Sequence, residues 1–223
     1  MKTKLPSYID HTLLRPSAQK AEILQLCEEA KKYGFFSVCV NSYYVPLCVE
    51  KLKGSNVKVC SVIGFPLGMS LTQVKMSETR YALEAGAREI DMVINVGALK
   101  DRNEAVVYHD IHSIAEVVKG YNGLLKVIIE TSLLTEEEKI LACKISKKAG
   151  ADFVKTSTGF STGGATIEDV KLMAKHAYPL FVKASGGIKN QQQALAMIEA
   201  GASRLGTSSG VEIIQGQTSE KTY

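Results

Sequence analysis

Three stretches of the sequence share one pattern: AGAREIDMV at 85–93, AGADFVKTS at 149–157 and AGASRLGTS at 200–208. In each stretch a glycine between two alanines closes a helical segment, and a run with buried-strand character follows. Glycine suits the left-handed residue that ends many helices, because that backbone conformation costs glycine little. Each stretch therefore predicts a helix that leads directly into a buried strand.

A fourth glycine, Gly34, occupies the same place in YGF at 33–35. The four glycines follow one another at intervals of 52, 64 and 51 residues, about twice the length of a strand-plus-helix unit of ~30 residues. The cap therefore recurs in every second unit, and four pairs of units give eight.

Apolar runs rich in Val and Ile, typical of parallel strands covered by helices, alternate with helical patterns along the whole chain. The predicted strands are 8–12, 37–40, 57–63, 90–94, 124–129, 153–155, 180–182 and a short one around Leu205. The predicted helices are 18–33, 45–52, 71–85, 103–118, 136–149, 167–176 and 191–200. This order predicts an α/β fold, a (β/α)8 TIM barrel that forms a single domain over 1–223 with a short polar tail at about 216–223. An open doubly wound sheet is the alternative architecture.

Composition limits the class of protein. The 223 residues are 45% hydrophobic and 22% charged, which excludes a disordered, collagen-like or coiled-coil chain. A net charge of +4 without a basic run argues against a nucleic-acid partner, and we find no signal peptide or membrane-spanning stretch. The five cysteines are odd in number and lack a Cys-x-x-Cys pair, so we expect neither disulfides nor a zinc site, and a cytoplasmic location.

Three charged residues interrupt the predicted strands: Asp91 in EIDMVIN, Lys155 in DFVKTSTG and Lys183 in LFVKASGG. Catalytic side chains of such barrels lie at the carboxyl ends of strands. One lysine alone would most simply form a structural ion pair with Asp91. Two lysines on consecutive strands exceed what one carboxylate neutralises, so the second requires a shifted pKa or a ligand.

Schiff-base formation requires such an arrangement, because its nucleophile is a neutral amine. An ordinary lysine is neutral in only about 0.04% of molecules at pH 7. A second ammonium about 5 Å away opposes protonation by roughly 3.3 kcal/mol at an effective dielectric constant of about 20, and burial adds to this effect. The lysine pair therefore predicts covalent imine chemistry.

Loops rich in glycine and small hydroxyl residues follow the lysine-bearing strands. TSTGFSTGGAT at 156–166, Gly186-Gly187 and GTSSG at 206–210 have the character of anion-binding turns. Each alone is ordinary turn chemistry. Together, after the last strands of a barrel, they predict a phosphate site.

These motifs together resemble the deoxyribose-phosphate aldolase family of class I aldolases, nearly from end to end. The resemblance rests on IDHTLL at 9–14, VCVN at 38–41, VIGFPLG at 62–68, EIDMVIN at 89–95, KVIIET at 126–131, both lysine motifs and GTSSG at 206–210. It implies a metal-independent, cofactor-free lyase that cleaves 2-deoxy-D-ribose 5-phosphate to acetaldehyde and D-glyceraldehyde 3-phosphate.

The resemblance also implies residue roles. Lys155 would form the Schiff base, Lys183 would keep its neighbour's amine neutral, and Asp91 would act as general acid and base through a water molecule. Phosphate contacts would come from Gly159, Gly186, Gly187, Ser208 and Ser209, and sugar contacts from Asp10 and Thr158. Some members carry a lysine where this chain has Phe160, so phosphate binding here would depend more on amide groups.

Other expectations remain open from the sequence. Tyr223, at the end of the polar tail, is a candidate for proton transfer, and Cys39 matches a cysteine linked in some members to inactivation by aldehydes. Glu130 ends a predicted strand and could act as a base, bind a backbone amide or pair with Lys126. Alternative functions are another class I aldolase or transaldolase, a non-covalent sugar-phosphate isomerase, and a binding protein. We also expect a homo-oligomer, either dimer or tetramer.

Overall fold

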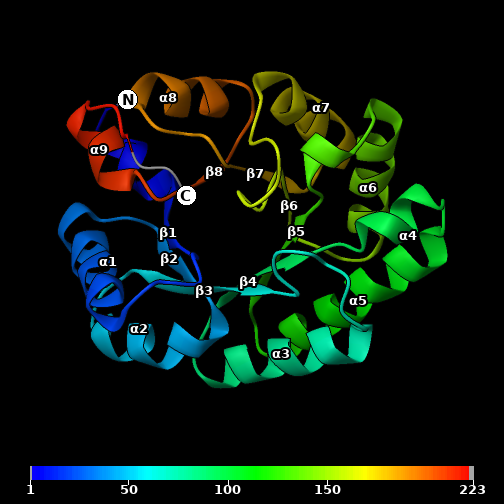
Figure 1. Cartoon of the computed structure of the whole chain (residues 1–223), viewed down its shortest axis with the longest axis horizontal. Coiled ribbons are helices and arrows are strands. Elements are labelled where there is room, and N and C mark those ends of the chain that lie inside the picture. The colour runs from blue at the N-terminus through cyan, green and yellow to red at the C-terminus, as the bar shows by residue number, and fades with distance from the viewer. Residues whose placement is uncertain (1, 221–223) are drawn as a thin grey trace.

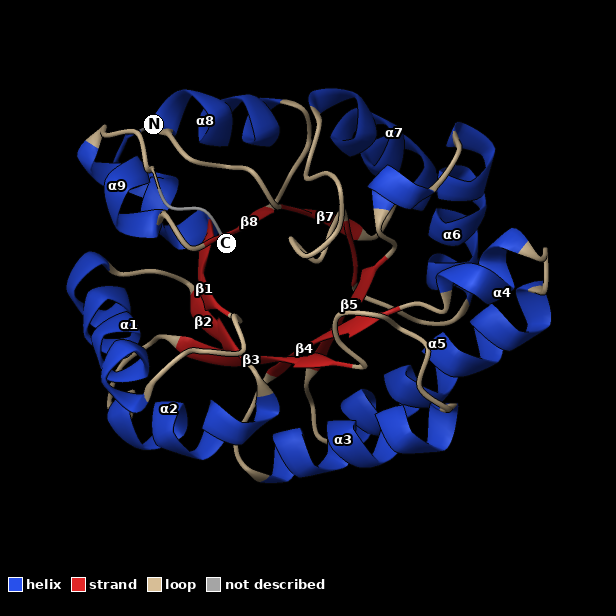
Figure 2. Cartoon of the chain, viewed as in Figure 1, coloured by secondary structure: helices blue, strands red, loops and turns tan. Residues whose placement is uncertain are grey.

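Eight parallel strands close into a barrel in the computed structural model, which describes residues 2–220 (Figures 1 and 2). The strands pair in chain order, and β8 returns to pair with β1. Parallel neighbours require long crossovers, so helices lie outside each strand pair. The strands are β1 (Ile9–Leu13), β2 (Ser37–Val40), β3 (Lys58–Ile63), β4 (Glu89–Val93), β5 (Leu124–Ile128), β6 (Phe153–Lys155), β7 (Phe181–Ser185) and β8 (Arg204–Thr207).

A ring of helices surrounds the strands (Figure 2). The α-helices are α1 (Lys20–Tyr33), α2 (Val45–Lys51), α3 (Thr72–Glu84), α4 (Val96–Lys100), α5 (Glu104–Gly120), α6 (Glu136–Lys148), α7 (Ile167–Ala177), α8 (Gln191–Glu199) and α9 (Gly210–Gln215), and short 3₁₀ turns are η1 (Lys2–Tyr8), η2 (Ser42–Tyr44) and η3 (Thr131–Leu133). No helix among the described residues is long and apolar enough to cross a membrane.

The closed sheet confirms the (β/α)8 prediction and excludes the open doubly wound sheet. Most boundaries agree with the sequence to within one or two residues. Strand β7 continues to Ser185, beyond its predicted end at Val182, and β8 is longer than the apolar signal of Leu205 alone. Helices α4 and α9 have five and six residues, too few to display a helical period, so no apolar pattern predicted them.

The predicted glycine caps are also confirmed. Gly34, Gly86, Gly150 and Gly201 all have positive φ, between 69° and 115°. They follow α1, α3, α6 and α8, which are the helices after β1, β3, β5 and β7. The repeat therefore marks every second strand-plus-helix unit.

Apolar residues are distributed unequally over the two faces of the strands. One large cluster fills the layer between strands and helices. A second, small cluster consists of Leu14, Cys39, Cys60 and Val62, with Phe65 packed against it. It faces the barrel interior, because the Cys60 thiol contacts Asp91 there. The rest of the interior is largely polar, which directs attention to the groups that share it.

Candidate active site

Lys155 and Lys183 lie directly opposite each other on β6 and β7. Strand alternation points both side chains into the barrel. Their Nζ atoms both donate to Oδ2 of Asp91 on β4, each at 2.8 Å. Lys183 and Asp91 are fully buried, and Lys155 is 2% exposed. The structure therefore brings together the three residues that the sequence singled out.

Lys183 has a second carboxylate, which the sequence analysis did not anticipate. Its Nζ lies 2.5 Å from Oδ2 of Asp10 on β1. The other oxygen of Asp10 accepts hydrogen bonds from Ser37 and Arg204, each at 2.7 Å. Asp91 consequently does not neutralise both lysines alone, because Lys183 is shared between two carboxylates.

These contacts belong to a closed circuit of alternating charges, which we call the charge ring. Arg204, which contacts Asp10, also contacts Glu89, with 3.2 Å between Nη1 of Arg204 and Oε2 of Glu89. Lys126 then links Glu89 at 2.5 Å to Oδ1 of Asp91 at 2.9 Å, which completes the circuit. The members in order are Asp91, Lys183, Asp10, Arg204, Glu89 and Lys126, all at most 5% exposed. Lys155 is attached to the ring at Asp91.

The charges of the ring balance without Lys155. Three carboxylates face three permanent cations, so the ring is neutral when all six groups are ionised. A protonated Lys155 adds one positive charge beyond the three that the ring carboxylates balance. Buried charges are costly unless paired, and Lys155 is the cation attached to the ring that shares its only ion-pair carboxylate among the described residues, Asp91, with Lys126 and Lys183.

The pKa values within the ring favour its ionised form. Burial alone would raise the pKa of Asp91, but Lys126, Lys155 and Lys183 hold it well below the usual value. Burial would lower the pKa of Lys183, but Asp10 and Asp91 raise it above the usual value. Burial would also lower the pKa of Lys126, but Asp91 and Glu89 help to raise it well above the usual value. Lys183 therefore remains an ammonium beside Lys155.

A cavity of about 560 Å³ opens beside these strands. All five residues predicted to contact phosphate line it: Gly159, Gly186, Gly187, Ser208 and Ser209. The loops after β6, β7 and β8 thus form one concave surface. Lys189 also lines the cavity.

Close backbone packing shapes this cavity. The Ala165 amide donates to the Gly186 carbonyl at 3.0 Å. A Cβ atom on Gly164 would lie 2.3 Å from the same carbonyl oxygen, so this position admits only glycine without movement of the loop. The glycine-rich composition that suggested an anion site therefore has a steric basis.

Glu130 holds the loop after β6 through hydrogen bonds to Thr158. It follows β5, has a left-handed backbone with φ of 57°, and is 4% exposed. Its carboxylate accepts hydrogen bonds from the Thr158 hydroxyl at 2.5 Å and from the Thr158 amide at 3.2 Å. Burial raises the pKa of Glu130, although both bonds from Thr158 oppose this. Of the open alternatives, backbone-amide binding is confirmed, and the Lys126 pairing is wrong because Lys126 pairs with Glu89 and Asp91.

Two predicted sugar contacts lie deeper than expected. Asp10 is fully buried within the charge ring, and Thr158 is 4% exposed and bonded to Glu130. Ser157, which the sequence analysis placed on the same face as Lys155 but gave no role, has a buried hydroxyl without a hydrogen-bond partner. Tyr223 lies outside the described residues. The tail before it is anchored, since the Ser219 amide donates to the Lys189 carbonyl at 3.0 Å.

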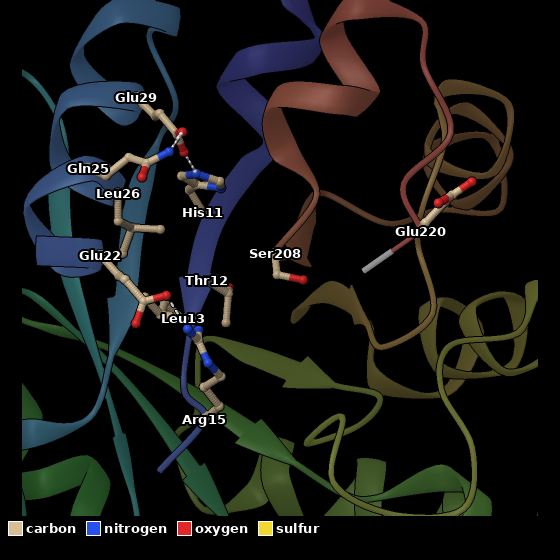
Figure 3. Close-up of a pocket in the computed structure, with 10 residues that line it drawn as sticks. All are labelled: His11, Thr12, Leu13, Arg15, Glu22, Gln25, Leu26, Glu29, Ser208 and Glu220. Atoms are coloured by element: carbon tan, nitrogen blue, oxygen red, sulfur yellow. Dashed lines mark hydrogen bonds and ion pairs between the residues drawn. The ribbon is translucent and has the colours of Figure 1, made fainter. Parts of the chain in front are cut away.

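A second pocket, of about 510 Å³, adjoins the first (Figure 3). It lies between β1, α1 and the end of the described tail, and Ser208 lines both pockets. Two contacts join polar groups within it, His11 to Glu29 at 2.7 Å and Arg15 to Glu22, and the carboxylate residue Glu220 also lines it. The first pocket is therefore better suited to an anionic group.

Comparison with known proteins agrees with this geometry. A family model described as "DeoC/LacD family aldolase" matches residues 5–216. The chain belongs to this family of aldolases. The DeoC/LacD aldolases are lyases, and the fold found here also agrees with solved members.

Individual relatives of this aldolase family cover nearly the whole chain. A deoxyribose-phosphate aldolase of Geobacillus sp. is 59% identical over 100% of both chains. One of Thermococcus gammatolerans is 60% identical over 95% of this chain and 96% of its own. The solved structure of the tetrameric deoxyribose phosphate aldolase from Aeropyrum pernix has a TM-score of 0.91, with 38% identity over 96% of this chain and 91% of that one.

Proposed function

We propose that this chain catalyses the reversible cleavage of 2-deoxy-D-ribose 5-phosphate to acetaldehyde and D-glyceraldehyde 3-phosphate, as a class I aldolase that needs neither metal nor cofactor. The observation that carries the proposal is the surplus cation at Lys155. An amine that loses its proton to leave a balanced cluster is a nucleophile ready for a carbonyl group. The names of relatives at 59% and 60% identity support the same substrate.

The reaction begins when the neutral Lys155 amine attacks the aldehyde carbon of the open-chain sugar. The carbinolamine then loses water to give a protonated imine. The C3 hydroxyl gives up its proton as the C2–C3 bond breaks, which releases D-glyceraldehyde 3-phosphate and leaves an enamine on Lys155. Protonation at C2 and hydrolysis of the imine release acetaldehyde and restore the amine.

Asp91 is the proposed acid and base for these proton transfers, acting through a water molecule. Its Oδ2 already contacts Lys155 Nζ at 2.8 Å, which places a carboxylate beside the carbon that reacts. Lys183 is the fixed ammonium that disfavours protonation of Lys155. Asp10 holds Lys183 in place, a positioning role rather than the direct sugar contact expected from the resemblance.

The 5-phosphate would bind in the first pocket. Its lining includes Gly159, Gly186, Gly187, Ser208 and Ser209, and Lys189 adds positive charge. Thr158 would contact a sugar hydroxyl only while Glu130 holds its loop. Tyr223 remains a proposed aid to proton transfer at the enamine carbon. Deletion of Tyr223 alone tests this role, and unchanged proton exchange into acetaldehyde would refute it.

The assembly and location of the protein are also proposed. The tetrameric Aeropyrum pernix relative supports a homo-oligomer. The five free cysteines, all buried, support a reducing compartment such as the cytoplasm. We further propose that the whole chain acts as a single domain.

Imine trapping tests the mechanism. The protein is incubated with acetaldehyde and borohydride, and the adduct is mapped by mass spectrometry. We expect a reduced ethyl adduct on Lys155 that is absent in Lys155→Ala and forms much more slowly in Lys183→Ala. Adducts spread over surface lysines in every variant would favour the isomerase instead, with Asp91 or Glu130 as its base. Product analysis with 2-deoxy-D-ribose 5-phosphate separates the proposed aldolase from other class I aldolases.

A further inference from the structure

Two cysteines face the charge ring, and the reaction proposed above uses neither. Cys39 on β2 and Cys60 on β3 are direct neighbours in the strand register, and both are fully buried. The Cys60 thiol donates to Oδ1 of Asp91 at 3.2 Å. The two sulfur atoms and an Asp91 oxygen all lie within 4.8 Å of one another.

The sequence led us to expect no zinc site, but the fold brings together ligands from three strands. We propose that Cys39, Cys60 and Asp91 form an inhibitory binding site for a soft divalent cation of the zinc and cadmium class. Zinc and cadmium prefer thiolate ligands, whereas magnesium and calcium prefer oxygen. In a tetrahedral site with Zn–S bonds of about 2.3 Å, two sulfurs lie about 3.8 Å apart. The three ligand atoms lie within 4.8 Å of one another, so they need to move closer by about 1 Å at most to reach this spacing, and three protein ligands leave a fourth position for water.

The strand register keeps the two thiols available for such an ion. Adjacent strands lie about 4.8 Å apart with parallel side-chain directions, whereas a disulfide requires Cβ atoms about 3.8 Å apart. Both cysteines are free. A metal ion can bridge the two sulfurs at the separation that the strands impose, without drawing the strands together.

Binding would not change the charge of the interior. The cation forms two metal–sulfur bonds, and the two thiols release two protons to the solvent. The added charge of +2 is thus offset by two thiolates. The Lys126 ammonium lies 2.9 Å from Asp91 Oδ1 and 3.5 Å from the Cys60 sulfur. The metal would replace this ammonium as the partner of Asp91 Oδ1.

Occupation of the site would stop the proposed aldolase reaction. A metal bound at Oδ1 withdraws electron density from the Asp91 carboxylate, whose Oδ2 serves Lys155 and Lys183. Asp91 could then no longer accept and return a proton. The inhibition rests on the proposed function, but the binding of the ion does not.

A second thiol pair provides a matched control. The Cys48 thiol lowers the pKa of Cys27, so these two cysteines form a second thiol pair. Neither belongs to the cluster of metal-type ligands found among the described residues, which consists of Cys39, Cys60 and Asp91. Cys27 lies on α1, outside the barrel interior. A cation bound at that pair would leave the charge ring untouched.

The experiment is a cadmium titration of the full-length protein after treatment with EDTA. Binding is followed by cadmium–thiolate charge-transfer absorption and by the protons released, and activity is measured in parallel. We compare the unaltered protein with Cys60→Ser, Cys39→Ser and the control Cys27→Ser. Each variant's inhibition is referred to its own activity without cadmium, and circular dichroism establishes that each is folded.

We expect inhibition by cadmium and zinc but not by magnesium. Inhibition should weaken by at least about 100-fold in Cys60→Ser and Cys39→Ser, since even loss of an outer partner of a metal site costs 10- to 100-fold, and remain unchanged in Cys27→Ser. Equal inhibition of Cys60→Ser and unaltered protein would overturn the proposal. So would a charge-transfer signal lost only in Cys27→Ser. Both absorption and proton release are measured without catalysis, so they test the site even if the aldolase proposal fails.

Discussion

Lys155 and Lys183 face each other across β6 and β7, and both ammonium groups donate to the same oxygen of Asp91 at 2.8 Å. Among the described residues, Lys183 alone of the two has a second carboxylate within ion-pair distance, Asp10 at 2.5 Å. The two lysines therefore differ in electrostatic support although their sequence motifs are nearly alike. This asymmetry supports the proposal that Lys155 is the nucleophile and Lys183 the permanent charge.

Replacement of the surplus cation should abolish activity without weakening the fold. In Lys155→Met the charge ring keeps equal numbers of positive and negative groups, and a buried ammonium is replaced by an apolar side chain of similar length. We expect no imine adduct and a free energy of unfolding that is unchanged or higher by about 1 kcal/mol. Urea denaturation measures this. A loss of several kcal/mol would contradict the charge count.

Lys126 and Glu89, two ring members without an ion pair to Lys155, should change imine formation in opposite directions. Lys126→Met removes one cation, so Lys155 must stay protonated to balance the three carboxylates. Glu89→Gln removes one anion, so the interior carries one more uncompensated positive charge and the neutral form of Lys155 is favoured further. At pH 7 we expect slower trapping in the first and faster trapping in the second, each by about tenfold. Each change removes one ion-pair partner from two buried charges that keep another, so a decrease in both variants would indicate structural damage only.

Glu130 should affect substrate affinity more than turnover, because it acts through Thr158. In Glu130→Gln we expect KM to rise several-fold with a small change in kcat, since a neutral amide holds the loop less firmly than a carboxylate. A large decrease in kcat with KM unchanged would instead make Glu130 a base, as in the isomerase alternative.

The same variant should change the pH dependence of stability. The pKa of Glu130 is raised in the folded protein, so its favourable contribution is present below the unfolded pKa and is lost as pH rises through the folded pKa. Glutamine does not titrate. The stability of Glu130→Gln relative to the unaltered protein should therefore improve from pH 4 toward pH 7 in thermal unfolding, and a constant difference would refute the shift.

Lys189 should act on the phosphate alone. Lys189 is among the residues that line the pocket formed by the loops after β6, β7 and β8. In Lys189→Ala we expect KM for 2-deoxy-D-ribose 5-phosphate to rise about tenfold, the loss of one charge-assisted contact. Unphosphorylated 2-deoxy-D-ribose serves as the control substrate and should react as before. An equal loss with both sugars would place Lys189 outside the phosphate site.

Sequence patterns predicted the barrel because its signals are local. Each glycine cap and each apolar run depends on neighbouring residues, and Gly86 or Gly150 marks a helix end wherever the helix packs. Side-chain alternation along a strand is also local, and it predicted on which face of their strands Lys155 and Lys183 lie. Helix α9 was too short for a period, and its place was not predicted.

The charge ring could not be predicted, because its contacts join distant parts of the chain. Arg204 and Asp10 are 194 positions apart and meet only when β8 closes onto β1. From the sequence alone, an arginine after AGAS would be expected at the surface. The register of β8 instead points its side chain into the barrel. Glu130 was noticed as a strand end, but its partner Thr158 depends on how the next loop folds back.

The interior of this barrel also limits how the protein can be made more robust. In many barrels branched apolar side chains fill the centre in layers, whereas here ionised groups occupy much of that volume and the apolar cluster beside them is small. Cohesion must therefore come mainly from the layer in which the helices pack against the outer faces of the strands. Engineering for heat tolerance should substitute residues in that outer layer and leave the centre as it is.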